Sequence, residues 1–165
     1  MYQVGQKVFY GSHGVCSVLD IETKTVDRKP VRYFALAPLD HPDARYYIPT
    51  ENPTALAKIS PLMERRELEA IFAGTMDQSI WISDENRRKQ RYRELISSGD
   101  RRSLFAMIYA LNQHRKQQEE QGRKFHLCDE NFLRDAQKLI CSEVAEVMNM
   151  SNAEADAYIS TWLDK

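Results

Sequence analysis

The residues with the clearest chemical potential form one basic stretch, Glu85 to Arg102, with the sequence ENRRKQRYRELISSGDRR. It holds six arginines and one lysine against three carboxylates, in a chain of 165 residues whose formal net charge is only −1. A guanidinium group binds phosphate or carboxylate oxygens through paired N–H donors, so several of them together can hold an extended anion. The stretch therefore indicates an anion-binding surface.

Charge is unevenly distributed along the chain. Residues 86–124 contain 11 basic and 4 acidic side chains, a net charge of +7, whereas residues 125–165 contain 3 and 8, a net charge of −5. Glu85 and Glu94 can pair with basic neighbours at helical spacing, so an ordinary solvated face is the alternative. We favour anion binding because soluble surfaces usually mix the two signs, and a nucleic acid backbone suits a spread of arginines better than one small ligand does.

A helix that we expect over residues 83–99 would arrange these charges. At 100° per residue its apolar side contains Tyr92, Leu95 and Ile96, with Arg87, Arg88 and Arg91 on an adjacent arc and Lys89 and Arg93 on the other flank. No helix-turn-helix spacing, zinc finger or RNP motif is present, so the contacts would be mostly to phosphates. The residues that we assign to DNA are Arg87, Arg88, Lys89, Arg91, Arg101, Arg102 and Trp81.

Trp81, in the segment QSIWISDEN just before the basic helix, has two interpretations. An aromatic side chain can wedge into a base step and so give selectivity for DNA shape. The same ring can instead pack in the core or between domains. The sequence leaves both open.

Four short runs in the first sixty residues predict strands. They lie at 7–10, 15–26, 31–39 and 45–49, are rich in Val, Ile, Tyr, Phe and Thr, and are separated by the turn clusters GSHG, DRKP and DHPDA. Because a lone hairpin is marginal in water, we expect a small, strongly bent sheet or partial barrel. Its open edge could pair with another chain.

The chain beyond residue 59 predicts helices. We expect one over 60–74 with Ser60 as N-cap, one over 83–99, one from Asp100 to Gly122, a long one capped by Asp129 and a short one opened by Ser151. The predicted fold class is therefore α+β, with a β domain at residues 1–59 and a bundle of about five helices at residues 60–165.

Several protein classes are disfavoured. The chain has no run of about 18 apolar residues and no signal-peptide layout, so we expect a cytoplasmic, nucleoid-associated protein without membrane contact. Cys16, Cys128 and Cys141 lack CxxC spacing, and the four histidines are scattered, so we expect no metal site. No paired carboxylates, phosphate loop, HExxH or GxSxG is recognisable, so we expect neither an enzyme nor a small-molecule cofactor.

Three segments, in order and spacing, resemble one family. VGQKVFYGSHGVCSVLDIETK (4–24), YYIPTEN (46–52) and NRRKQRYRELISSGD (86–100) are similar to the CarD/CdnL-type bacterial transcription factors, whose N-terminal module is shared with transcription-repair coupling factor. The likeness spans nearly the whole chain. Each motif is weak alone, and the series is fairly specific.

The resemblance implies a Tudor-like N-terminal domain that binds the β subunit of RNA polymerase, and a helical domain that contacts promoter DNA near the melted region and stabilises the open complex. It implies polymerase-binding roles for Lys24, Tyr46, Tyr47 and Pro49, with Tyr47 standing where some relatives have arginine. The family's wedge tryptophan corresponds to Glu85, and Trp81 is the only tryptophan nearby. We expect a monomer, and the alternative is an adaptor whose basic face binds an acidic protein.

Overall fold

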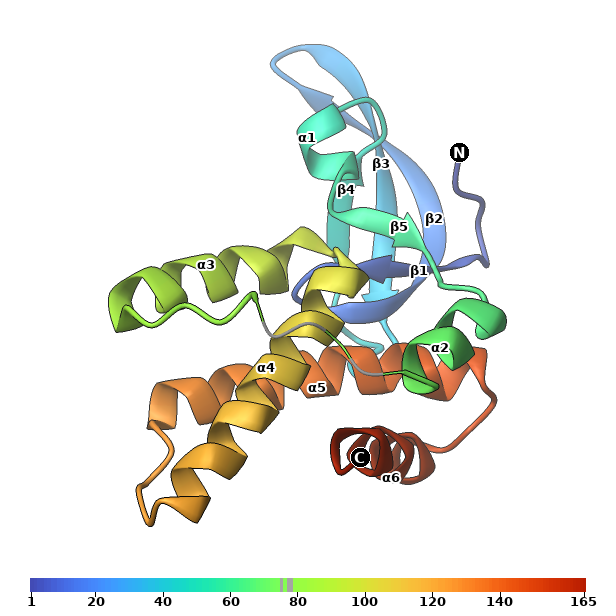
Figure 1. Ribbon diagram of the computed structural model, residues 1–165. Helices are drawn as coiled ribbons and strands as arrows, with labels where there is room; N and C mark the ends of the chain where they lie inside the picture. Colours follow the sequence, from blue (N-terminus) through green and yellow to red (C-terminus); the bar gives the residue numbers. More distant parts are fainter. Residues whose placement is uncertain (75, 77–78) are drawn as a thin grey trace.

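The computed structural model describes residues 1–74, 76 and 79–165, with a sheet on one side and helices on the other (Figure 1). The strands are β1 (Lys7–Tyr10), β2 (Gly14–Val26), β3 (Lys29–Pro38), β4 (Tyr46–Pro49) and β5 (Ile59–Pro61). The helices are α1 (Pro53–Leu56), α2 (Arg65–Phe72), α3 (Glu85–Ser98), α4 (Arg101–Glu120), α5 (Leu127–Val147) and α6 (Asn152–Leu163). The predicted α+β fold, a bent sheet followed by a helical bundle, is confirmed.

The strands form one antiparallel sheet in the order β4-β3-β2-β1-β5, so β4 and β5 are its two edges. The register between β2 and β3 shifts at Leu19, and such a bulge bends the strand that carries it. At the far end of this pair, Asp27 and Arg28 have positive φ angles of 50° and 66°. Two such residues form the turn that matches the twist of a hairpin. The bend and the tight turn give the sheet the curvature that the strand pattern predicts.

The fifth strand and the first short helix were not predicted. Ser60 was expected to cap a helix, which is wrong, because Ser60 pairs with Phe9 across β1 and β5. The first helix of the bundle, α2, starts later, with Glu64 in the N-cap position. Asn52 caps the one-turn helix α1 by accepting from the N–H groups of Thr54 and Ala55.

Most of the other helix boundaries follow their sequence signals. Asp100 caps α4 and Ser151 caps α6, as predicted, and each side chain accepts from a backbone N–H three residues on. Gly99 ends α3 in the left-handed region with φ of 75°. The expected cap at Asp129 is wrong: α5 begins at Leu127, and Asp129 is a buried residue of its first turn.

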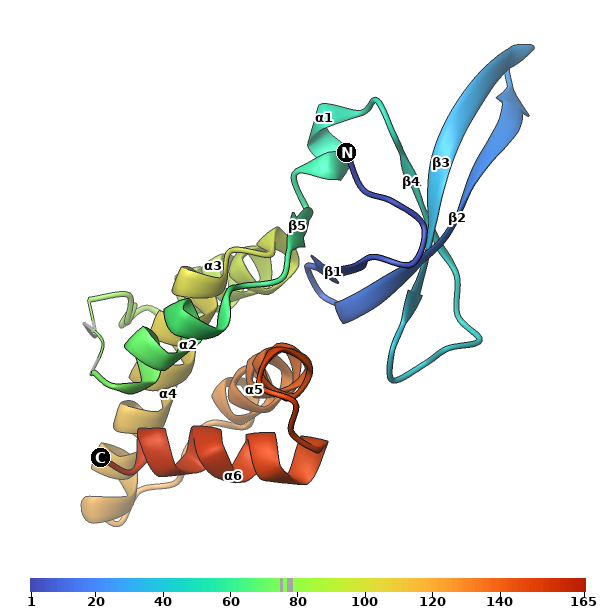
Figure 2. The same cartoon turned by 90° about the vertical axis from the view of Figure 1, so that its right-hand side faces the viewer.

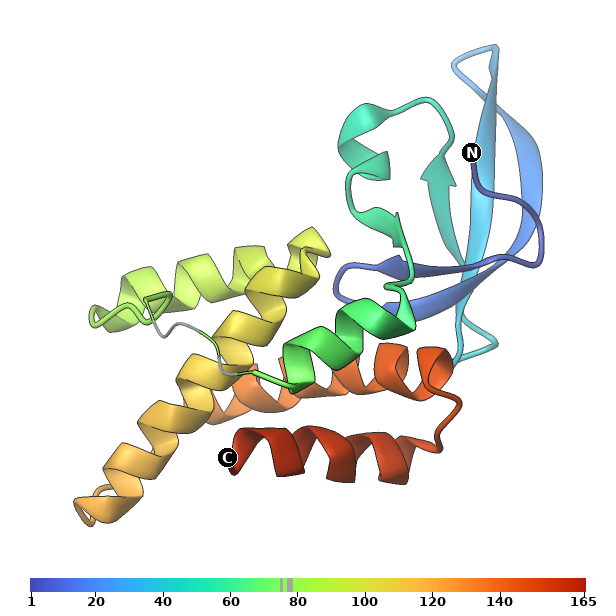
Figure 3. The ribbon, with the colours of Figure 1, turned by 45° about the vertical axis from the view of Figure 1, so that its right-hand side comes forward.

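Two apolar clusters form the interior. The smaller one lies inside the curved sheet around Val8, Phe34 and Leu36. The larger one fills the helical bundle and also takes in Phe9 and Val15 from the sheet. Figure 2 shows the sheet beside the helices with α5 seen end-on, and Figure 3 shows α5 passing below the sheet with α6 alongside it. The sheet and the bundle therefore share part of one core.

Candidate functional site

Helix α3 keeps the apolar side that its sequence predicts. Tyr92 and Leu95 are buried in the core of the bundle, and Asp84 caps the helix by accepting from the N–H of Arg87. Burial raises the pKa of Tyr92 to about 12, so its hydroxyl stays protonated and donates to the carbonyl of Ile80. In Figure 1, α3 projects from the bundle, which leaves its opposite side open to a partner.

Arg88 does not lie on that open side. It is 4% exposed, and its Nε and Nη2 donate to the two carboxylate oxygens of Asp129, each at 2.8 Å. Its Nη1 also donates to the carbonyl of Ile82 at 2.9 Å. This corrects the exposed position expected from the sequence, because Arg88 joins α3 to α5 inside the bundle and bonds there to protein acceptors.

Arg101 is also directed inward. Its Nη1 donates to Ser60 Oγ, its Nη2 donates to the carbonyl of Pro61, and its Nε lies 3.3 Å from Glu143 Oε1. The guanidinium group lies 4.7 Å from the ring centroid of Phe9. The side chain is 10% exposed and fills the space between the sheet and α5. Here too the structure departs from the exposed surface that the sequence predicted.

The remaining basic residues of α3 form two rows on its outer side. Arg87 and Arg91 make one row and Lys89 and Arg93 the other, about 160° apart around the helix. Between them lies a polar strip, formed by Asn86, Gln90 and Ser97, with the carboxylate of Glu94 on its Arg87/Arg91 side. We name the two rows with this strip the α3 basic face.

Two carboxylates reduce the charge of the α3 basic face. Lys89 pairs with Glu85 at 3.2 Å, and Arg91 pairs with Glu94 at 3.5 Å. Both pairs lie at the surface and are four or three residues apart, so each contributes little to stability and can open in favour of a phosphate.

Arg102 lies on a different part of the surface. It lines a depression of about 450 Å³ together with Arg66 and Glu67 of α2. The sequence led us to expect that all the arginines could gather on one face. The structure instead separates the basic residues of α3 from those at the contact between α2 and α4.

Trp81 is packed in a cluster beside α3. Its ring stacks on that of His114 at a centroid distance of 3.9 Å, and the Arg88 guanidinium lies 4.5 Å from its centroid. Burial lowers the pKa of His114, which keeps the imidazole neutral in this stack. Trp81 is half-buried, and a wedge role would require it to leave both contacts.

Lys24 and Tyr47, both assigned to polymerase, meet on the outer face of the sheet. The Lys24 ammonium nitrogen lies 3.6 Å from the centroid of the Tyr47 ring, although β3 separates their strands. Tyr47 is 40% exposed and stands on the edge strand β4, so a basic and aromatic patch lies beside an unpaired strand edge.

The other two residues of that set lie elsewhere. Tyr46 faces the helices, and its ring stacks on that of His13 at 4.0 Å. Pro49 ends β4 and lines a depression of about 710 Å³ with Thr50, Asn52 and Pro53. Three of the four predicted residues therefore belong to the edge strand β4 and Lys24 belongs to β2, and the four do not share one surface.

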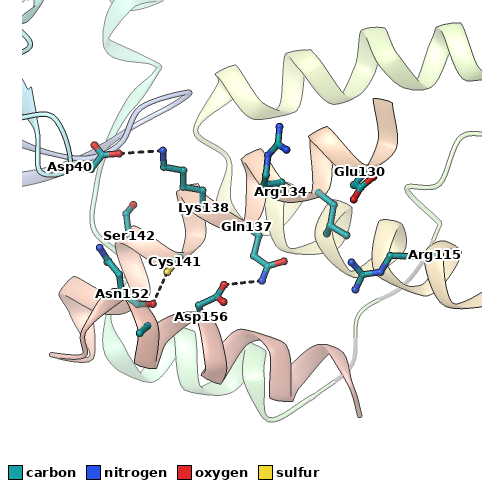
Figure 4. Close-up of a pocket in the computed structure, with 12 residues that line it drawn as sticks. Asp40, Arg115, Glu130, Arg134, Gln137, Lys138, Cys141, Ser142, Asn152 and Asp156 are labelled. Atoms are coloured by element: carbon teal, nitrogen blue, oxygen red, sulfur yellow. Dashed lines mark hydrogen bonds and ion pairs between the residues drawn. The ribbon is translucent and has the colours of Figure 1, made fainter. Parts of the chain in front are cut away.

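A groove of about 680 Å³ lies along α5 and α6 (Figure 4). Gln137 in this groove points at Asp156 with a 3.1 Å hydrogen bond, and Lys138 points at Asp40 at 3.8 Å. No cluster of three or more potential metal ligands occurs among the residues that the structure describes. Across the same residues, no helix combines the length and apolar character needed to span a membrane.

The comparison with known families identifies the sheet. Residues 2–61 match the family model described as the CarD-like/TRCF RID domain, and these residues contain all five strands and α1. The predicted resemblance to CarD-like proteins is confirmed for this domain, residues 2–61. An RID domain is an RNA polymerase β-subunit interaction domain and is not catalytic, so the match indicates a transcription-related protein that interacts with RNA polymerase. No curated protein matched the chain.

Two structural residues of the site were missed from the sequence. Asp129 and Glu143 are buried, and they hold Arg88 and Arg101. The sequence does contain a signal for their burial, because both residues lie on the apolar stripe of α5 that includes Phe132, Ala136 and Ile140. A carboxylate in such a stripe needs a buried partner.

Proposed function

We propose that this chain binds the β subunit of RNA polymerase through its RID sheet and grips promoter DNA through the α3 basic face, so that it stabilises the open promoter complex. The observation that carries the proposal is the match of residues 2–61 to the RID domain. The resemblance of residues 86–100 to the DNA-contacting helix of CarD-type factors supports the proposed contact with promoter DNA. The protein acts by binding both partners, with no catalytic step.

The polymerase contact is proposed at β4 and the patch beside it. An edge strand has unpaired N–H and C=O groups that can add a strand from a partner. Lys24 and Tyr47 supply one charged and one aromatic contact next to that edge, a combination that is common in interface hot spots. For Tyr46 and Pro49 we propose a supporting role, in which they hold the strand β4 in place for this contact.

The DNA contact is proposed on the two rows of the α3 basic face. Rows on opposite flanks of one helix can contact phosphates on both sides of a groove, with the polar strip between them facing the groove. Such contacts carry little sequence information, which suits a protein that acts at a promoter already chosen by polymerase. Polymerase binding raises the local concentration of the face near DNA, so weak intrinsic affinity is enough.

The polymerase half is tested by binding the full chain to RNA polymerase. We expect Lys24→Ala and Tyr47→Ala each to weaken binding by about 2- to 30-fold, because each removes a contact worth about 0.5–2 kcal/mol. The matched control is Lys29→Ala, which removes the same charge from the exposed hairpin end of β3. Equal affinities for all three variants would refute the proposed surface.

The DNA half is tested by the lifetime of open complexes after a competitor challenge. The full chain should lengthen this lifetime, and the double variant Arg87→Ala/Arg93→Ala should lose most of the effect while still binding polymerase. An adaptor for an acidic protein predicts the opposite result, namely an unchanged lifetime and no competition by duplex DNA at physiological salt.

A further inference from the structure

The sheet and the helical bundle are joined by contacts along one face of α5. Lys138, Ser142 and Glu146 are spaced four residues apart and so lie on the same side of this helix. They contact Asp40, the N–H of Val15 and Lys7 respectively, all from the sheet half. Figure 4 shows Lys138 and Asp40 pointing at each other. This face of α5 is therefore a platform for the sheet.

A second contact ties the sheet to α3 itself. The turn between β1 and β2 has the sequence GSHG, and the N–H of Ser12 donates to the carbonyl of Ile96 at 3.0 Å. Gly11 sits so close to the end of α3 that a Cβ there would lie 2.3 Å from the carbonyl oxygen of Ser97 and 2.7 Å from the nitrogen of Gly99. Only glycine allows this approach. The turn therefore docks on the junction between α3 and α4.

Arg101, the second residue of that junction after Gly99, links three elements. Its guanidinium binds Ser60 and Pro61 of β5 and also Glu143 of α5. Glu143 is fully buried, and its other oxygen accepts from the N–H of Met63 at 3.0 Å. Arg101 has hydrogen bonds to β5, and Glu143 has one to Met63, while the two charges pair with each other at 3.3 Å. This arrangement fixes a geometry, since losing either partner leaves a buried charge.

We propose that Arg101 and the Gly11–Gly14 turn are positioning elements, which hold α3 at a fixed orientation to the edge strand β4. The polymerase contact and the DNA contact would then be made by one rigid body, and not by two domains on a hinge. The effect at the promoter rests on the proposed function. The rigid connection between the sheet and the helices is a property of the chain alone. Arg101 acts on DNA through α3 and does not itself bind DNA.

The structural part is tested without any partner. Backbone ¹⁵N relaxation of the full chain should give one rotational correlation time for the sheet and the helices. We expect Gly11→Ala to give two different values, with changes in the amide shifts limited to the residues around the shared core at Phe9 and Val15. The matched control is Gly74→Ala, because a Cβ at Gly74 meets nothing within 4 Å. Arg101→Lys, which keeps the charge but loses the forked donors, is the second variant if Gly11→Ala does not fold.

The consequence is tested by thermodynamic coupling. Polymerase should raise the DNA affinity of the wild-type chain, and the loosened variants should lose about tenfold of that gain, since a flexible link still keeps part of the effective concentration. Their separate affinities for polymerase and for DNA should stay within twofold of wild type. Two correlation times in the wild-type chain overturn the rigid-body proposal. A single correlation time in both Gly11→Ala and Arg101→Lys, or independent motion with full coupling, overturns the positioning role. If the wild-type chain binds neither partner, the proposed function is wrong. The relaxation experiment still shows whether the sheet and the helices tumble as one rigid body.

Discussion

At the scale of single residues, two arginines in one basic run have different roles. Arg87 is exposed on α3, whereas its neighbour Arg88 is enclosed and bound to Asp129. The sequence predicts the apolar side of α3 from Tyr92 and Leu95 but places Arg88 beside it and not within it. The partner of Arg88 lies 41 residues further along the chain, and helical periodicity alone carries no information about such a contact.

We therefore expect opposite results for two adjacent substitutions. Arg88→Ala should lower the free energy of unfolding by about 3–5 kcal/mol, because it leaves the Asp129 carboxylate buried without its partner. Arg87→Ala should change it by less than about 0.5 kcal/mol, as is usual at an exposed site. Urea unfolding of the two variants measures both values. Equal effects on stability would contradict the assigned roles.

The buried carboxyl group of Glu143 predicts a pH dependence. Burial raises its pKa above the ordinary 4.5, with Arg101 acting in the opposite direction. A raised carboxyl pKa means that the folded chain binds the proton more tightly than the unfolded chain, so this group contributes stability below pH 4.5 that is lost as the pH rises through its folded value. The unfolding free energy of the wild type relative to Glu143→Gln should therefore fall with rising pH over that window. A rise would show that the ion pair with Arg101 dominates.

At the scale of elements, the strands β1 to β4 and the caps at Asp100 and Ser151 follow from local sequence pattern, while β5 does not. Ser60 followed by Pro61 is a good local signal for a helix start. That signal is overridden because pairing with β1 completes the backbone hydrogen bonds of both strands. A three-residue strand has too little sequence to show alternation, so only the neighbouring strand could identify it.

The segment that enters α3 yields a prediction about Trp81. Its stack with His114 and its contact with Arg88 indicate packing, so Trp81→Ala should cost about 1–3 kcal/mol of stability. The DNA affinity of the folded variant should stay within twofold. Thermal unfolding and duplex binding test this together. Unchanged stability with a shorter open-complex lifetime would instead favour the wedge role.

At the scale of the whole molecule, the charge imbalance read from the sequence is real, but part of it is used internally. Two carboxylates of the acidic C-terminal half, Asp129 and Glu143, fold back onto Arg88 and Arg101. The net charge of 86–124 therefore overstates what a partner meets. Local composition predicts that a basic surface exists, and only the packing of α5 decides which residues belong to it.

This reduced set predicts the salt dependence of DNA binding. With Arg87, Lys89, Arg91 and Arg93 as the phosphate contacts, a plot of log affinity against log salt concentration should have a slope of about −4. Arg93→Ala should make the slope shallower by about 0.9, and Arg101→Lys should leave it unchanged. Titration of duplex DNA at several salt concentrations measures the slope. A value near −6 would mean that further basic residues take part.

The core that is shared between the two halves limits how this protein can change over evolution. Phe9 and Val15 belong to strands of the RID sheet, yet they are buried among side chains of the helical bundle. An RID sheet taken from another protein would need apolar residues of similar shape at these two positions. Otherwise the core of the recipient bundle would contain a cavity. The sheet thus supplies part of the core of the bundle. Recombination at the junction after Pro61 would therefore be selected against, even in a chain that still binds both polymerase and DNA.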